Sequence, residues 1–141
     1  MSAAIDEVHP PELSPTMAID AAQIGTWEID LSGPAPRPTW SAGYGGAFGL
    51  PDDQLPRTAE DTYALMDADD RDTMRSAFSA MLRHDEPLQA EFRVVTDTGT
   101  HWHAMRGRAL RGPDGRAIRL VGVGMDVTAR RSAEAELDRS R

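Results

Sequence analysis

The stretch that decides the fold is "LVGVGMDVTARRSAEAELDRSR", residues 120–141. Its first half alternates in the way of a β-strand, whose successive side chains point to opposite faces of a sheet. Its second half is charged, and only Ala133 and Leu137 form an apolar stripe at helical spacing. Threonine is a favoured residue at the start of a helix. The stretch therefore predicts a strand that runs directly into a polar helix capped by Thr128.

Composition limits the class of protein. The chain has 141 residues, enough for one domain with a substantial core. It has no apolar run near the ~18 residues that a membrane span needs. It also contains no cysteine, which excludes disulfides, cysteine nucleophiles and thiolate metal sites. The net charge is -8 and the basic residues are scattered, which disfavours nucleic acid and anionic membranes as partners. We expect a cytoplasmic protein.

Periodicity predicts the remaining elements. Pro10 and Pro11 indicate a flexible extension over residues 1–12. Domain 13–128 follows, and residues 129–141 begin a C-terminal helix. We expect helices over 15–23, 58–66 (capped by Thr58) and 67–84, and strands over 26–31, 39–43, 88–95, 101–110 and 117–127. Helices placed between two groups of hairpin-connected strands indicate an α+β fold with helices over one face of an antiparallel sheet.

Several motifs match a known family in order and spacing. They are "GTWEIDL", "TWSAGYGGAFGLPDDQLP", "DADDRDTMRSAF" and the run from "AEFRVVTDTGTHWHAMRG" to "GVGMDVTARR". Over about residues 13–141 the chain resembles a PAS domain of the type attached to bacterial sensor kinases and cyclic-di-nucleotide enzymes. The resemblance implies a five-stranded antiparallel sheet of order 2-1-5-4-3, with helices enclosing a pocket. The His-Pro-Asp-Asp that often precedes the long helix is here Asp67-Ala68-Asp69-Asp70.

The resemblance also implies site residues. Asp126, Val127 and Thr128 would transmit a signal from the central last strand to the C-terminal helix. A homodimer would form through the flanking helices and the outer face of the sheet, with Met17, Ala21, Trp102, Ala133 and Leu137 as candidates. The pocket would be lined by Trp27, Ile29, Phe78, Phe92, Val94, His103, Met105, Gly122 and Gly124. His103 is the polar member, and a histidine among apolar neighbours is more often a satisfied core residue than a ligand contact.

Cofactors of relatives are disfavoured. A photoactive flavin adduct needs a cysteine on the long helix, and the chain has none; Gly124 stands where those relatives carry glutamine. A haem needs an axial histidine that reaches the pocket, and only His84 at the end of the long helix is available. We therefore predict no cofactor. A small metabolite or an empty packed core remains open.

Metal and enzyme hypotheses rest on few residues. "DADDRD" fails the calcium-loop template, because Arg71 and Asp72 occupy its fifth and sixth positions. His101 and His103 share a strand face but lack an evident third ligand, for which only Glu28, Asp30 or His84 could be nominated.

A small enzyme would use Asp126 or Asp30 as a buried general base with a raised pKa. The competing interpretation, that Asp126 joins strand to helix, is favoured because Thr128 follows it.

The leading hypothesis is a non-catalytic sensory module with a kinase or cyclase as effector. The alternatives are a free-standing adaptor for signalling proteins that binds no small ligand, and the small enzyme.

Overall fold

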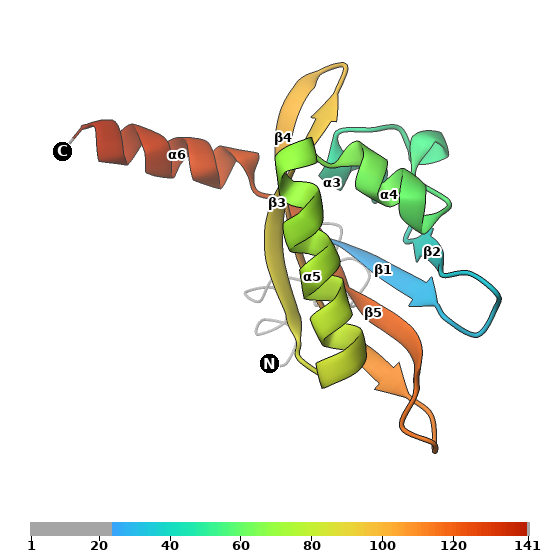
Figure 1. The fold of residues 1–141 in the computed structure, drawn as a ribbon. Coiled ribbons are helices and arrows are strands. Elements are labelled where there is room, and N and C mark those ends of the chain that lie inside the picture. Colours follow the sequence, from blue (N-terminus) through green and yellow to red (C-terminus); the bar gives the residue numbers. More distant parts are fainter. Residues whose placement is uncertain (1–23, 141) are drawn as a thin grey trace, which may run out of the picture.

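The computed structural model describes residues 24–140, and Figure 1 shows their arrangement. The predicted N-terminal extension, the helix over 15–23 and the interface candidates Met17 and Ala21 lie outside these residues. The elements are β1 (Ile24–Asp30), β2 (Arg37–Trp40), α3 (Gly45–Phe48), a 3-10 turn η1 (Asp52–Gln54), α4 (Ala59–Leu65), α5 (Ala68–His84), β3 (Leu88–Thr96), β4 (Gly99–Arg111), β5 (Ala117–Asp126) and α6 (Thr128–Arg139).

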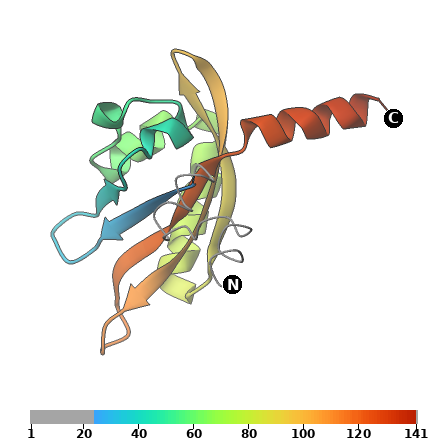
Figure 2. The same ribbon diagram turned by 180° about the vertical axis from the view of Figure 1, so that it is seen from behind.

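The five strands form one antiparallel sheet of order β2-β1-β5-β4-β3, which confirms the predicted order. β5 lies in the middle, paired with β1 on one side and β4 on the other. Helices α3, α4 and α5 lie against one face of this sheet (Figures 1 and 2). The α+β prediction is therefore confirmed.

Local capping explains where the helices begin. The Thr58 hydroxyl accepts a hydrogen bond from the Asp61 N–H at 3.0 Å, as predicted for the start of α4. The Asp67 carboxylate accepts one from the Asp69 N–H at 2.9 Å and so starts α5. α5 buries Met74, Phe78 and Met81, three or four residues apart, against the sheet.

Two sequence predictions need correction. The second strand was predicted over 39–43, but β2 spans Arg37–Trp40 and includes Pro38. Proline lacks the N–H that a central strand needs, but β2 is an edge strand and tolerates it. The second correction concerns Thr128, which does not cap α6 with its side chain: Val127 is the residue before the helix, without a side-chain cap.

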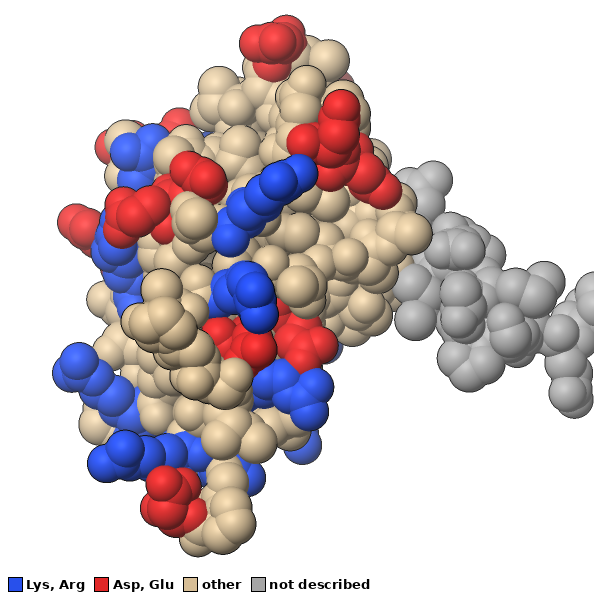
Figure 3. Space-filling model, turned by 90° about the vertical axis from the view of Figure 1, so that its right-hand side faces the viewer, with Lys and Arg blue, Asp and Glu red and all other residues tan. Residues whose placement is uncertain are grey.

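α6 is the exception to the packing of the other helices. It leaves the end of β5 and projects away from the domain in both views (Figures 1 and 2), and none of its residues is buried. Figure 3 shows acidic and basic side chains interspersed on one side of the molecule, as expected from scattered charges in the sequence. Within residues 24–140, no helix combines the length and the apolar character that crossing a membrane requires.

Candidate functional site

The inner face of the sheet centres on His103, whose side chain is completely buried. Its Nδ1 lies 3.0 Å from the Ala47 carbonyl oxygen, and its Nε2 lies 2.9 Å from the Tyr44 hydroxyl. A carbonyl oxygen only accepts, so Nδ1 carries the proton and Nε2 accepts from Tyr44. Burial lowers the pKa of His103 to about 4. The imidazole is therefore neutral near pH 7 and its two ring nitrogens are satisfied.

Aromatic side chains pack against glycines on this face. Trp27 covers Gly122 on β5 and Gly107 on β4, which pair with each other across the two strands. Tyr44, just before α3, covers Gly25 on β1 and Gly124 on β5, another paired couple. A side chain at any of these glycines would collide with the ring above it. The rings occupy the space that the missing side chains leave.

The structure brings most predicted pocket residues together. Trp27, Phe78, Phe92, Val94 and Met105 are buried in the same core as His103, and Ile29 packs against it. A cavity of about 40 Å³ lies beside Ile29 and Phe78. Pockets for small molecules usually have volumes from about 300 Å³. The predicted pocket residues therefore contact one another and leave no ligand-sized space beside Ile29. A larger hollow of about 360 Å³, whose lining includes Gly25, Ala47 and Asp126, lies at the end of the sheet where β5 meets α6.

Sequence reasoning missed two aromatic residues of this core. Tyr44 and Phe48 are each 1% exposed, and the Phe48 ring stacks on the imidazole of His103 with centroids 4.3 Å apart. Both belong to "GYGGAFG", where four glycines disfavour a long helix and the sequence indicates irregular structure with one weak helical turn at most. The signal that was available is the pair of aromatics four residues apart, which places both on one side of the short helix α3.

The joint between β5 and α6 is built from the predicted signalling residues. The Asp126 carboxylate accepts a hydrogen bond from the Thr128 N–H at 2.7 Å, so Asp126 satisfies the helix start. The Thr128 hydroxyl instead accepts from the Trp102 N–H on β4 at 2.8 Å. The Val127 N–H donates to the Trp102 carbonyl at 2.7 Å, and the Val127 side chain is buried. The first turn of α6 is thus fastened to β4 as well as to β5.

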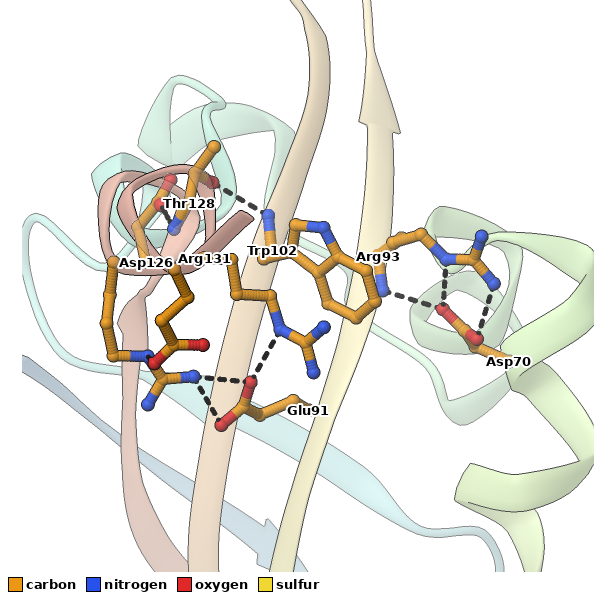
Figure 4. A network of polar contacts seen from close by, with 9 residues as sticks. Asp70, Glu91, Arg93, Trp102, Asp126, Thr128 and Arg131 are labelled. Atoms are coloured by element: carbon orange, nitrogen blue, oxygen red, sulfur yellow. Dashed lines mark hydrogen bonds and ion pairs between the residues drawn. The ribbon is translucent and has the colours of Figure 1, made fainter. Parts of the chain in front are cut away.

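Two arginines of α6 reach across the outer face of the sheet to Glu91 on β3 (Figure 4). Arg130 Nη2 lies 2.6 Å and Arg131 Nε lies 2.9 Å from Glu91 Oε1. Hydrogen bonds from Arg130, which has the larger effect, and from Arg131 lower the pKa of Glu91. The Arg131 guanidinium also lies 3.6 Å from the centre of the Trp102 ring. Beyond this first turn, the interface candidates Ala133 and Leu137 are exposed.

Other candidate groups are dispersed. His101 Nδ1 lies 3.2 Å from Asp126 Oδ2 and its Nε2 lies 2.9 Å from the Thr98 hydroxyl, so His101 and His103 have separate sets of partners. In the part of the chain that the structure describes, no three His, Asp or Glu side chains are close enough to hold a metal ion. Asp30 accepts from Ser32, which lowers its pKa, opposite to the raised pKa expected of a buried general base.

Comparisons with known proteins agree with this architecture. The family model described as the PAS fold matches residues 37–124. The chain belongs to the PAS-fold family. A solved sensory box histidine kinase/response regulator from Burkholderia thailandensis is 32% identical to this PAS domain, with a TM-score of 0.72; the match covers 89% of this chain and 93% of that one.

Two further solved structures share the fold at lower identity. The N-terminal domain of a diguanylate cyclase with PAS/PAC sensor from Marinobacter aquaeolei is 16% identical with a TM-score of 0.65, and the match covers 77% of this chain and 98% of that one. A PAS domain from Colwellia psychrerythraea is 19% identical with a TM-score of 0.59, over 81% and 94% of the two chains. No curated protein matches the chain.

Proposed function

We propose that this PAS domain is a non-catalytic sensory module of a bacterial signal-transduction protein. The state of its inner face would be transmitted through Asp126, Val127 and Thr128 to α6, and from α6 to a kinase or cyclase effector. The observation that carries the proposal is the continuity of the central strand β5 with α6. Gly124 on β5 leaves room for the Tyr44 hydroxyl, and Asp126 two residues later accepts a hydrogen bond at the start of the helix. A change at the core therefore lies within a few residues of the output helix.

The exposure of α6 supports an output role and dimerisation. It has twelve residues and no buried ones. Isolated helices of this length are marginal in water, so α6 needs a partner along its exposed side. We propose that a second copy of the chain supplies it through Ala133 and Leu137. The relative from Burkholderia, named as a sensory box histidine kinase, supports a kinase as the effector.

The packed core favours a second candidate function. The predicted pocket residues pack against one another and leave about 40 Å³ beside Ile29. Such a domain can act as an adaptor that binds signalling proteins and takes no small ligand. The two candidates differ in what the purified protein retains.

Native mass spectrometry of the freshly purified chain separates these candidates in one measurement. The sensory proposal predicts a dimer mass and a bound small molecule that collisional activation releases. An adaptor predicts the bare polypeptide mass. A monomer at the highest accessible concentration would contradict the proposed dimer.

Transmission from core to helix is tested with Tyr44→Phe. The variant removes the hydroxyl that donates to His103 Nε2 and leaves a buried acceptor unpaired, a defect of about 1–3 kcal/mol. We expect amide hydrogen exchange to become several-fold faster from Asp126 to Arg131. Tyr63→Phe is the matched control, because Tyr63 lies on α4 and packs on Phe78. Equal effects of the two variants on α6, or no effect of Tyr44→Phe, would refute transmission through β5.

A further inference from the structure

Trp102 lies between two guanidinium groups that come from different parts of the fold (Figure 4). Arg93 on β3, its partner in the strand register, places Cζ 5.4 Å from the centre of the indole ring. Arg131 on α6 places Cζ 3.6 Å from it. Both distances fall within the range of attraction between a cation and an aromatic face. One indole therefore contacts an edge strand and the output helix.

The first guanidinium is fixed by the start of α5. Asp70 Oδ2 accepts from the Arg93 backbone N–H at 2.8 Å and from Arg93 Nε at 3.0 Å, and Asp70 Oδ1 accepts from Nη2 at 2.8 Å. The Asp67 N–H donates to the Arg93 carbonyl at 2.9 Å. The hydrogen bonds from Arg93 lower the pKa of Asp70. A shift of the first turn of α5 must therefore move Arg93.

The second guanidinium is fixed at the start of α6. Glu91, two residues before Arg93 on the same strand, holds Arg131 Nε at 2.9 Å. The backbone of Trp102 joins the same region, since its N–H donates to Thr128 and its carbonyl accepts from Val127. Trp102 thus contacts α6 through its side chain, and its backbone forms hydrogen bonds with the start of the helix.

We infer that Trp102 is a positioning residue that couples the start of α5 to α6 through the series Asp70, Arg93, Trp102, Arg131 and Glu91. This route runs over β3 and β4 and is separate from the covalent route through β5. It rests on the proposed function of α6 as the output helix. It also gives Trp102 an intramolecular role in place of the dimer contact that the sequence predicted. A displacement of α5 would then change the helix even when the end of β5 stays in place.

The coupling is tested by hydrogen exchange of the α6 amides from Arg131 to Glu134. Asp70→Asn removes the charge that holds Arg93. Asp70 forms no hydrogen bond with the described residues of α6, but its charge also acts on Arg131, and this direct effect would persist without Trp102. We expect exchange in α6 to become about tenfold faster, which corresponds to about 1.4 kcal/mol. In a Trp102→Leu background, the same change should alter α6 exchange by less than about twofold. Such non-additivity is the signature of coupled residues.

A matched control lies at the other end of α5. Asp85→Asn alters the residue that follows the helix, where Asp85 pairs with Arg111 on β4. It should leave α6 exchange unchanged. If Asp70→Asn unfolds the domain, Arg93→Lys replaces it, because lysine keeps the charge but loses the planar group that stacks on indole. The core amides of Phe92 and His103 report whether each variant remains folded.

The outcomes distinguish the possible failures. Equal effects of Asp70→Asn and Asp85→Asn, or an Asp70→Asn effect that persists without Trp102, would overturn the coupling. Light scattering at the same concentration checks association, and a loss of dimer mass in Trp102→Leu would assign Trp102 to the interface and overturn it as well. The Tyr44→Phe experiment addresses the β5 route alone. A response there without one to Asp70→Asn would leave the proposed function standing and refute only the coupling.

Discussion

Gly122→Ala should lower the free energy of unfolding by about 3 kcal/mol, at the upper end of typical overpacking costs. A Cβ at this position would lie 2.5 Å from Trp27 Cζ2 and would also collide with the carbonyl oxygen of Arg106. Trp27 cannot move aside easily, because its Nε1 donates to the Val123 carbonyl at 2.9 Å. Its ring also packs edge-on against Phe78, with centroids 6.2 Å apart. Urea unfolding followed by circular dichroism measures the loss.

Gly46→Ala is the control for this prediction. Gly46 lies in α3, and a Cβ there meets no atom within 4 Å. Alanine is the better helix former, by up to about 1 kcal/mol, so this variant should be as stable as the wild type or slightly more stable. Trp27→Leu in the Gly122→Ala background should cost less than the sum of the single changes. A Gly122→Ala domain within about 0.5 kcal/mol of wild type would mean that the ring and the strand do not constrain each other.

The parts of the core that follow strand periodicity could be predicted from the sequence. Periodicity grouped the side chains of each strand by face, and the resemblance to PAS domains assigned Trp27, Phe92, Val94, His103 and Met105 to the inner face, where each is buried. Side chains alternate along a strand, so one inward residue fixes the others of the same strand. The same alternation, together with the inward assignment of His103, placed Trp102 on the outer face, where Arg131 lies over its ring.

The contacts between distant segments could not be predicted in this way. Glu91 contacts Arg130 and Arg131, about forty positions further along the chain, because β3 lies one strand beyond β4 from the end of β5. Tyr44 reaches His103 from a glycine-rich segment whose local preferences are weak. The Thr128 hydroxyl accepts a hydrogen bond from the Trp102 N–H because the register of the sheet places the two groups together. Each of these contacts depends on how distant segments are placed in the fold, which local sequence patterns do not predict.

The stability of the domain should fall by about 3 kcal/mol as the pH is lowered from 7 to 4, because of His103. Burial lowers its pKa from the ordinary 6.5 to about 4. Between these pH values His103 is protonated in the unfolded chain but not in the folded domain. The free energy of unfolding therefore falls by about 1.4 kcal/mol for each pH unit. The contribution is therefore fully present above pH 6.5 and is lost as the pH falls. Asp70 and Glu91, whose pKa values are lowered, lose their contributions at more acidic pH, below the ordinary carboxylate values.

The interval from pH 6.5 to 5 isolates the histidine, and there the free energy of unfolding should fall by about 2 kcal/mol. Urea titrations at each pH measure it. His103→Gln keeps a donor and an acceptor in the core but cannot titrate, so it should be less stable than wild type yet independent of pH over this interval. His84→Gln, at the exposed end of α5, should retain the wild-type slope. If His103→Gln keeps that slope, then the imidazole is not the group that resists protonation, and the neutral Tyr44–His103–Ala47 chain of hydrogen bonds is wrong.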